Sequence, residues 1–288
     1  MKTIKMNMVE MKVPTLVKWA GGKKQLLTQF NRFFPAKIEK YFDIFVGGGA
    51  VAFYVIQKYH PKEVFISDSN KELIDTYEVI RDNPNELIEI LKEHKKKHNK
   101  EYYYKIRELI PENLFKIERA GRFIYLNKSC FNGLYRVNSK GQFNVPIGSS
   151  KNPAILMGED LRLISRLLQK VTIKNISFEH ILNYAKKGDF IYLDPPYFPL
   201  KKESFTTYTA GKFLQKEQEQ LADIFREVDK RGCKIMLSNS DTEFIKTLYK
   251  GYKIHIVKAT RMINCDATKR GKINELVVLN YEPSQKQI

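Results

Sequence analysis

Short apolar runs alternate with amphipathic stretches at both ends of the chain. The runs are rich in Val, Ile, Phe and Tyr, which favours strands buried on both faces. The predicted strands are 40–46, 63–67, 171–176, 189–193, 233–238, 252–259 and 273–281. Residues 50–59 and 215–232 carry apolar stripes with a helical period and are predicted helices. This alternation predicts an α/β fold with a mainly parallel sheet covered on both faces.

The last two predicted strands, 252–259 and 273–281, have no helical pattern between them. A parallel pair needs a crossover connection, whereas an antiparallel pair needs only a loop. The last strand is therefore predicted to run antiparallel.

The middle of the chain has a different pattern. Its apolar residues recur with helical spacing, which predicts helices at 70–80, 85–98, 101–110 and 117–128. Residues 134–146 contain the turn signal "NSKG" between two β-prone runs, which predicts a β-hairpin. We therefore expect residues 70–157 to form a helical domain, inserted into a catalytic domain made of 1–69 and 158–288.

The charge of the chain indicates a polyanionic partner. Its 288 residues include 50 Lys and Arg but only 32 Asp and Glu, a formal charge of +18. Such an excess is typical of proteins that bind nucleic acid, although a soluble basic protein without that function can also carry it.

Composition argues against several other classes. The three cysteines lie far apart without a CxxC pair, so neither a zinc knuckle nor a disulfide framework is indicated. His94 and His98 have i,i+4 spacing but lie in "KEHKKKHNK", which we interpret as a solvated helix face and not as a metal site. The N-terminus lacks the apolar core of a signal peptide, and no apolar run is long enough for a membrane helix. A reducing cytoplasm is the expected compartment.

A glycine-rich turn follows the first predicted strand. In "DIFVGGGAVA", Gly47, Gly49 and Ala52 match the loose pattern G-x-G-x-x-G/A between a strand and a helix. Asp68 follows the next strand, where a carboxylate can hold ribose hydroxyls. The pattern predicts a nucleoside site without choosing between a nicotinamide cofactor and S-adenosylmethionine, and a glycine turn made for packing remains an alternative.

A second glycine pair lies in "VKWAGGKKQLL", residues 17–27, beside Trp19 and Lys23. The spacing does not match a P-loop, because Val17 replaces its first glycine and Lys24 its Ser or Thr. Trp19 by itself is equally consistent with a core aromatic residue.

The most informative stretch is "GDFIYLDPPYFPL", residues 188–200. Asp194 and the carbonyl of Pro195 offer two acceptors at the carboxyl end of a strand, and the two prolines Pro195 and Pro196 stiffen them. Tyr197 offers a ring for stacking. Two acceptors and a ring suit an exocyclic amine on a planar base, which they can make nucleophilic toward an electrophilic methyl group. A rigid turn without catalytic function is the alternative.

With these motifs in order, the chain resembles the adenine-N6 DNA methyltransferases of the bacterial Dam type over about residues 16–281. The resemblance rests on "KWAGGK", "DIFVGGGA", "FNGLYRVNSKGQFNVPIG" and "DPPY", with "SFTTY" and "SNSD" in support. It implies a Rossmann-like methyltransferase sheet and transfer of a methyl group from S-adenosylmethionine to adenine in duplex DNA, within the site GATC. It implies no metal.

The resemblance also implies residue roles. The catalytic group is Asp194, Pro195, Pro196 and Tyr197, which would hold a flipped-out adenine. The positions implied for the methyl donor are Trp19, Lys23, Phe45, Gly47, Gly49, Asp68, Ser177, Phe178 and Asp194. The positions implied for DNA are Lys18 at the first base pair, Phe131 as a wedge in the stack, Asn132 beside the orphaned base, and Leu134, Arg136 and Pro146 at base edges.

Arg136 also fits this role on chemical grounds, because an Arg beside a hairpin can give two hydrogen bonds to guanine. Residues 258–272 link the last two strands and include Lys269 and Arg270. This loop is predicted to clamp phosphates, and a solvated loop is the alternative.

The sequence is compatible with three competing functions. They are a nicotinamide-dependent dehydrogenase, a DNA-binding protein without catalysis, and a methyltransferase of RNA bases or protein amides. The sequence also leaves open whether a restriction nuclease acts on the same site.

Overall fold

The computed structural model of the chain describes residues 12–155, 158–199, 213–260 and 272–283. One seven-stranded sheet forms its centre, in the order β3-β2-β1-β4-β5-β7-β6. The strands are β1 (Lys40–Asp43), β2 (Glu63–Ser67), β3 (Val171–Lys174), β4 (Phe190–Leu193), β5 (Lys234–Ser240), β6 (Lys253–Thr260) and β7 (Lys272–Leu279).

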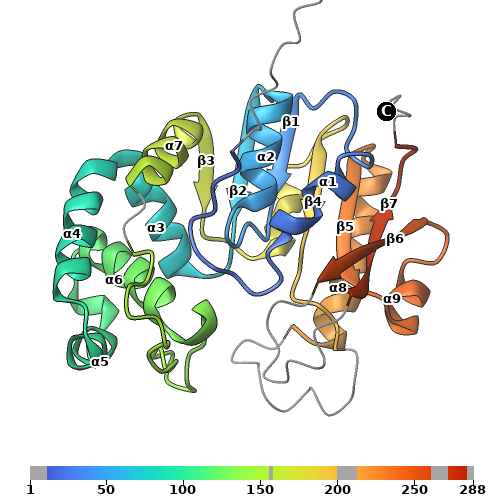
Figure 1. Ribbon diagram of the computed structural model, residues 1–288. Coiled ribbons are helices and arrows are strands. Elements are labelled where there is room, and N and C mark those ends of the chain that lie inside the picture. Colours follow the sequence, from blue (N-terminus) through green and yellow to red (C-terminus); the bar gives the residue numbers. More distant parts are fainter. Residues whose placement is uncertain (1–11, 156–157, 200–212, 261–271, 284–288) are drawn as a thin grey trace, which may run out of the picture.

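The first five strands run parallel, and β7 lies antiparallel between β5 and β6 (Figure 1). The α/β fold, the predicted strands and the antiparallel last strand are therefore confirmed, with most boundaries moved by one or two residues. The strand predicted at 40–46 ends earlier, at Asp43, because the chain turns there into the glycine segment.

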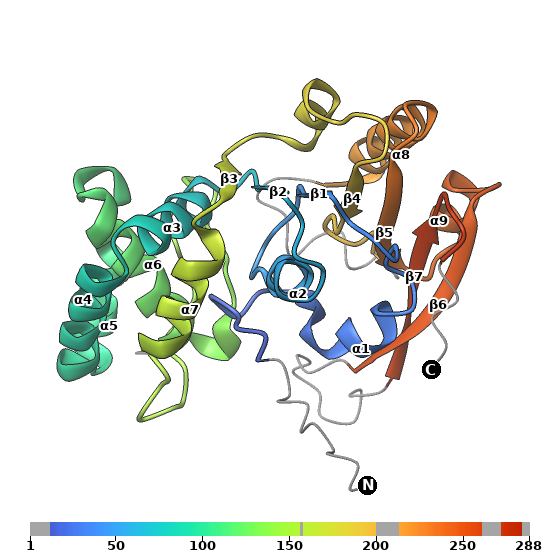
Figure 2. The same cartoon turned by 90° about the horizontal axis from the view of Figure 1, so that it is seen from above.

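Helices cover both faces of the sheet (Figure 2). Those outside the middle of the chain are α1 (Leu27–Phe30), α2 (Ala50–Tyr59), α7 (Gly158–Leu168), α8 (Gln215–Lys230) and α9 (Glu243–Leu248). The two faces follow from alternation along the strands. In β4, Phe190 and Tyr192 join the core beneath α1 and α2, whereas Ile191 and Leu193 join the core beneath α8 and α9.

The middle of the chain forms a helical cluster beside the β3 edge (Figure 1). Its helices are α3 (Lys71–Asp82), α4 (Pro84–Lys97), α5 (Lys100–Glu108) and α6 (Lys116–Ser129). Beyond α6, Val137 and Phe143 form an antiparallel bridge, closed by a hydrogen bond from Asn138 N to Gln142 O of 2.9 Å. The predicted helices and hairpin are present, while the division into domains at 70–157 stays a prediction.

The interpretation of residues 94–98 as a solvated helix face is wrong for His94. Its side chain is buried, stacks on Tyr125 with ring centroids 4.8 Å apart, and places Nδ1 2.9 Å from the Tyr102 hydroxyl. Gly121 on α6 lets α4 approach closely, because a Cβ there would come within 2.6 Å of Ile90. Burial lowers the pKa of His94 to about 4, so the ring is neutral at physiological pH.

Candidate active site

Three acidic residues lie at the carboxyl ends of neighbouring parallel strands. Asp43 ends β1, Asp68 follows β2 and Asp194 follows β4. Because β1 pairs with both β2 and β4, the three carboxylates share one edge of the sheet. This is the edge at which open α/β sheets bind ligands.

Asp194 forms an ion pair beneath this edge. Its Oδ1 lies 2.8 Å from Nζ of Lys23, whose side chain is only 4% exposed. Lys23 begins the 3₁₀ helix η1 (Lys23–Leu26) and also donates to the carbonyl of Gly21. Burial raises the pKa of Asp194 to about 6, although the Lys23 ammonium opposes the shift. The sequence predicted both residues for the site, and the structure brings them together.

The turn after Asp194 is held by two buried side-chain amides that the sequence analysis did not identify. Gln218 of α8 donates from Nε2 to the carbonyl of Pro196 at 2.8 Å and accepts from Asn239 at 3.0 Å. Asn239 of β5 in turn accepts from the backbone N of Phe198 at 3.2 Å. These bonds fix the path of the two prolines and leave Asp194 and Tyr197 at the mouth of the strand.

The Tyr197 side chain has two contacts, one at its hydroxyl and one at its ring. Its hydroxyl donates to Oε2 of Glu275 on β7 at 2.8 Å, and Nζ of Lys23 lies 4.6 Å from its ring centroid. Sequence reasoning missed Glu275, since "INELVVLNY" reads only as a strand.

The glycine turn lies next to these groups. Gly47 and Gly49 have φ of 46° and 79°, in the left-handed region that glycine adopts most readily. A Cβ on Gly47 would lie 2.7 Å from the ring of Trp19, so the predicted tryptophan packs directly on the turn. Asp68 Oδ2 accepts from the backbone N of Gly47 at 3.2 Å, which joins the turn to the end of β2.

Aromatic rings form one wall beside the turn. Phe45 and Phe178 are stacked, with centroids 5.7 Å apart and planes 28° apart. Phe213, which the sequence did not single out, contacts both rings. Ser177 directly precedes the 3₁₀ helix η4 (Phe178–Asn183), and its hydroxyl donates to Glu179. Phe45 thus lies beside Phe178, although the two are far apart in the sequence, and the contact of Phe45, Ser177 and Phe178 with a methyl donor stays a prediction.

Lys18 and the segment after α6 meet through one buried amide. Asn127 of α6 accepts from the backbone N of Lys18 and donates to its carbonyl, both at 2.9 Å. The same side chain donates to the carbonyl of Gly133 at 3.1 Å. A Cβ on Gly133 would lie 2.3 Å from the Lys18 side chain, so the two segments are in direct contact.

Most of the predicted DNA-contacting residues of the hairpin region are exposed. Phe131 is 43% exposed, and its backbone N donates to the carbonyl of Pro146 at 2.8 Å. Asn132 is exposed, with φ of 55°. Leu134 is half-buried, and the Arg136 guanidinium donates to the side chain of Asn144 at 2.7 Å. Lys269 and Arg270 lie outside the described residues.

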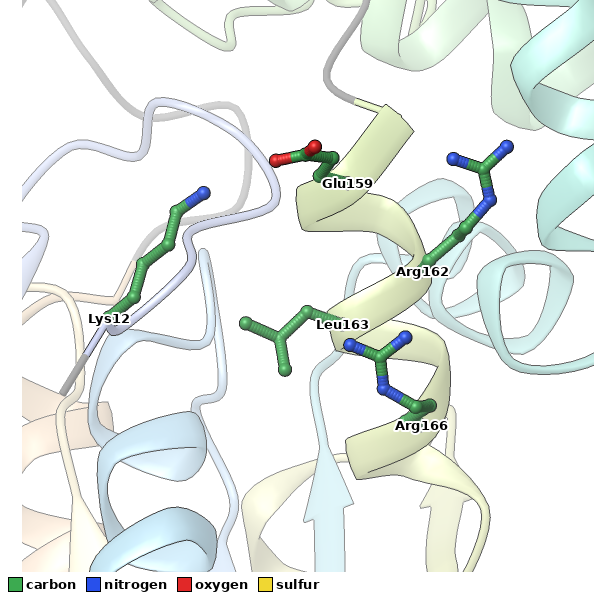
Figure 3. Close-up of a pocket in the computed structure, with 5 residues that line it drawn as sticks. All are labelled: Lys12, Glu159, Arg162, Leu163 and Arg166. Atoms are coloured by element: carbon green, nitrogen blue, oxygen red, sulfur yellow. The ribbon is translucent and has the colours of Figure 1, made fainter. Parts of the chain in front are cut away.

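A pocket elsewhere on the surface contains none of these residues. It lies between α7 and Lys12, and its other lining residues are Glu159, Arg162, Leu163 and Arg166 (Figure 3).

In the part of the chain that the structure describes, no group of three or more His, Cys, Asp or Glu side chains is arranged to hold a metal ion. None of the helices among the described residues is long and apolar enough to cross a membrane.

Comparison with known proteins agrees with this geometry. Residues 19–263 match the family model of the D12 class N6 adenine-specific DNA methyltransferases. The chain is 45% identical to the type II methyltransferase M.MjaIII of Methanocaldococcus jannaschii, over 94% of this chain and 100% of that protein. It is 43% identical to the type II methyltransferase M1.LlaDCHI of Lactococcus lactis subsp. cremoris, over 92% and 94%. It is 32% identical to the DNA adenine methylase of Escherichia coli K12, over 93% and 95%. The chain therefore belongs to the D12 class of N6 adenine-specific DNA methyltransferases.

Proposed function

We propose that this enzyme transfers the methyl group of S-adenosylmethionine to N6 of an adenine flipped out of duplex DNA, within the site GATC. The observation that carries the proposal is Asp194, whose side chain is 17% exposed, paired with the buried Lys23 and followed by the rigid turn that ends in Tyr197. Family membership leaves no place for the dehydrogenase or for the DNA-binding protein without catalysis.

The residues around the glycine turn fit the methyl donor. Asp68 offers a carboxylate for ribose hydroxyls, and the stacked pair of Phe45 and Phe178 offers apolar faces for the donor's adenine. Gly47 and Gly49 leave the backbone open to close approach beside Trp19. When bound, S-adenosylmethionine supplies an electrophilic methyl group on a sulfonium. Lys23 keeps Asp194 ionised next to that group.

The residues after β4 fit the target base. Asp194 and the Pro195 carbonyl accept the two N–H bonds of the adenine amine, which orients its lone pair away from them. The Tyr197 ring stacks on the base. Because Gln218 and Asn239 hold the turn before any base enters, the acceptors need little rearrangement during reaction.

The surface around Lys18 and the hairpin fits the DNA. Phe131 is exposed and well placed to fill the gap that a flipped base leaves, with Asn132 beside it for the orphaned partner. Lys18 approaches the same site from the catalytic side, because Asn127 fixes its backbone against Gly133. Leu134, Arg136 and Pro146 then face base edges, and Lys269 and Arg270 are proposed phosphate contacts.

The proposal is tested on plasmid DNA that lacks adenine methylation. After incubation with the purified enzyme and S-adenosylmethionine, GATC sites should resist a nuclease blocked by adenine methylation. They should become substrates for a nuclease that requires it. A labelled methyl group found in DNA without protection of GATC would refute the site. Label found only in added RNA or protein would refute the substrate class.

Asp68→Ala is expected to weaken binding of S-adenosylmethionine by about 1.5–3 kcal/mol, because a charge-assisted hydrogen bond to ribose is lost. Titration calorimetry without DNA measures this. Asp82→Ala, which removes an exposed aspartate paired with Arg81, is the matched control. Unchanged affinity in Asp68→Ala would place the ribose contact on another residue.

A further inference from the structure

Glu275 is a buried carboxylate that contacts neither the proposed donor site nor the target base directly. It lies in β7, opposite Ser240 of β5 and Val257 of β6, and is only 8% exposed. Burying a carboxylate is costly unless it has a partner. The hydroxyl of Tyr197 is that partner, at 2.8 Å.

The bond joins two parts of the active site that are distant in sequence. Tyr197 continues from β4, whereas β7 runs antiparallel two positions away in the sheet. The hydroxyl bond to β7 and the contact of the ring with the Lys23 ammonium both restrain the orientation of the Tyr197 side chain. If the Tyr197 hydroxyl had no partner, the side chain would have to be ordered when the base binds. The entropic cost of that ordering would offset part of the stacking energy.

Glu275 also acts on Asp194 through its charge. Burial is the main cause that raises the pKa of Asp194; Lys23 opposes the shift, and the negative charge of Glu275 adds to it. Among the described residues, the ionisable groups that interact with Asp194 are Lys23 of η1, Tyr41 and Asp43 of β1, Tyr192 of β4, Tyr197 after β4, and Glu275 of β7.

We infer that Glu275 is a positioning residue of the active site, which holds the Tyr197 ring in the orientation that receives the target adenine. The inference rests on the proposed function, since it assigns Tyr197 to the flipped base. Three substitutions separate the two effects of Glu275. Tyr197→Phe keeps the ring and removes the tether. Glu275→Gln keeps an acceptor for the hydroxyl and removes the charge. Glu275→Leu removes both.

The first experiment is a double-mutant cycle on the single-turnover rate, measured well above pH 6 with saturating donor and DNA. Tyr197→Phe and Glu275→Leu should each slow methylation about tenfold, the effect of one charge-assisted hydrogen bond. The double variant should be no slower than either single variant, because both remove the same bond. Losses that multiply to about a hundredfold, or no loss in Tyr197→Phe, would overturn the inference.

The second experiment measures the rate against pH. Since Glu275 raises the pKa of Asp194, Glu275→Gln should move the acidic limb of the pH–rate profile to lower pH than in wild type. Lys23→Met should move it upward, because Lys23 lowers the same pKa. An unmoved limb in Glu275→Gln would show that the carboxylate does not act on Asp194. If Glu275 only stabilised the fold, Glu275→Gln would lower the thermal stability without moving the acidic limb of the pH–rate profile.

Binding readouts separate failure of this inference from failure of the proposed function. DNA carrying 2-aminopurine at the target position reports base flipping by fluorescence, and we expect a smaller increase in Tyr197→Phe and Glu275→Leu than in wild type. Asn274→Ala, an exposed neighbour on β7 that contacts Asp241, is the control and should match wild type. If wild-type enzyme methylates no DNA adenine, the proposed function fails. If it does so and the variants match it, only the role of Glu275 fails.

Discussion

Asp194→Ala is expected to slow methyl transfer by on the order of 100- to 1,000-fold while donor binding changes little. The magnitude follows from removing one preorganised polar group that acts most strongly in the transition state. In the structure Asp194 is the only carboxylate paired with Lys23 among the described residues, so no neighbour takes over its place. Single-turnover methylation of a GATC duplex measures the rate, and calorimetry measures donor affinity.

Two further variants make the result specific. Asp194→Asn keeps one acceptor oxygen but loses the charge, so its rate should lie between those of wild type and alanine. Asp189→Asn changes an aspartate at the opposite end of β4, where Asp189 accepts from the backbone N of Lys186 at 2.8 Å. It should affect thermal stability more than rate. A rate for Asp194→Ala within about threefold of wild type would remove Asp194 from the chemistry.

The backbone elements near the site were predictable because their signals are local. Helix 50–59 and strand 63–67 have the predicted limits, since the apolar period, the glycines before α2 and Asp68 after β2 all lie within a few residues. The position of β7 between β5 and β6 was not predicted. Its pattern shows only a buried strand, and the choice of neighbours is made by the packing of the whole sheet.

The motif residues were also predictable, but their partners were not. Asp194 and Tyr197 stand out because a carboxylate, two prolines and a ring follow an apolar strand. Gln218, Asn239 and Glu275, which hold them, lie in a helix and two strands that look ordinary in sequence. Each becomes meaningful only when the fold brings it to the end of β4. The one available signal was a polar residue within an otherwise apolar strand, as at Glu275.

His94 shows the opposite error. The charged residues around His94 indicated a solvated helix face. Four of these neighbours are indeed exposed: Glu93, Lys95, Lys96 and Lys97. One turn of a helix presents residues to opposite sides, so a single histidine within a charged run still faces α6. Neighbouring charges describe the exposed face of α4 and not the side on which His94 lies.

Arg136→Ala is expected to relax sequence reading at one guanine of the site. Arg136 donates from Nε to the Asn144 side chain at 2.7 Å and from Nη2 to the Asn144 carbonyl at 3.3 Å. These bonds use two of the five N–H groups of the guanidinium, which leaves three that can donate to guanine O6 and N7. Loss of such a pair costs about 1–3 kcal/mol of discrimination at that base. The variant should therefore methylate duplexes altered at that guanine almost as well as GATC.

The measurement is a panel of duplexes with single-base changes in GATC, tested at several salt concentrations. Asn144→Ala should relax discrimination at the same guanine, but less strongly. This variant removes the side chain that holds the Arg136 guanidinium and leaves Arg136 in place. Lys140→Ala, at the exposed hairpin turn, is the matched loss of positive charge and should leave the ranking of the duplexes unchanged. Lys269→Ala and Arg270→Ala should weaken binding on every duplex and flatten its salt dependence by up to about one unit of slope per contact. If Arg136→Ala instead loses activity equally on every duplex, Arg136 contacts phosphate or supports the hairpin, and base reading belongs to other residues.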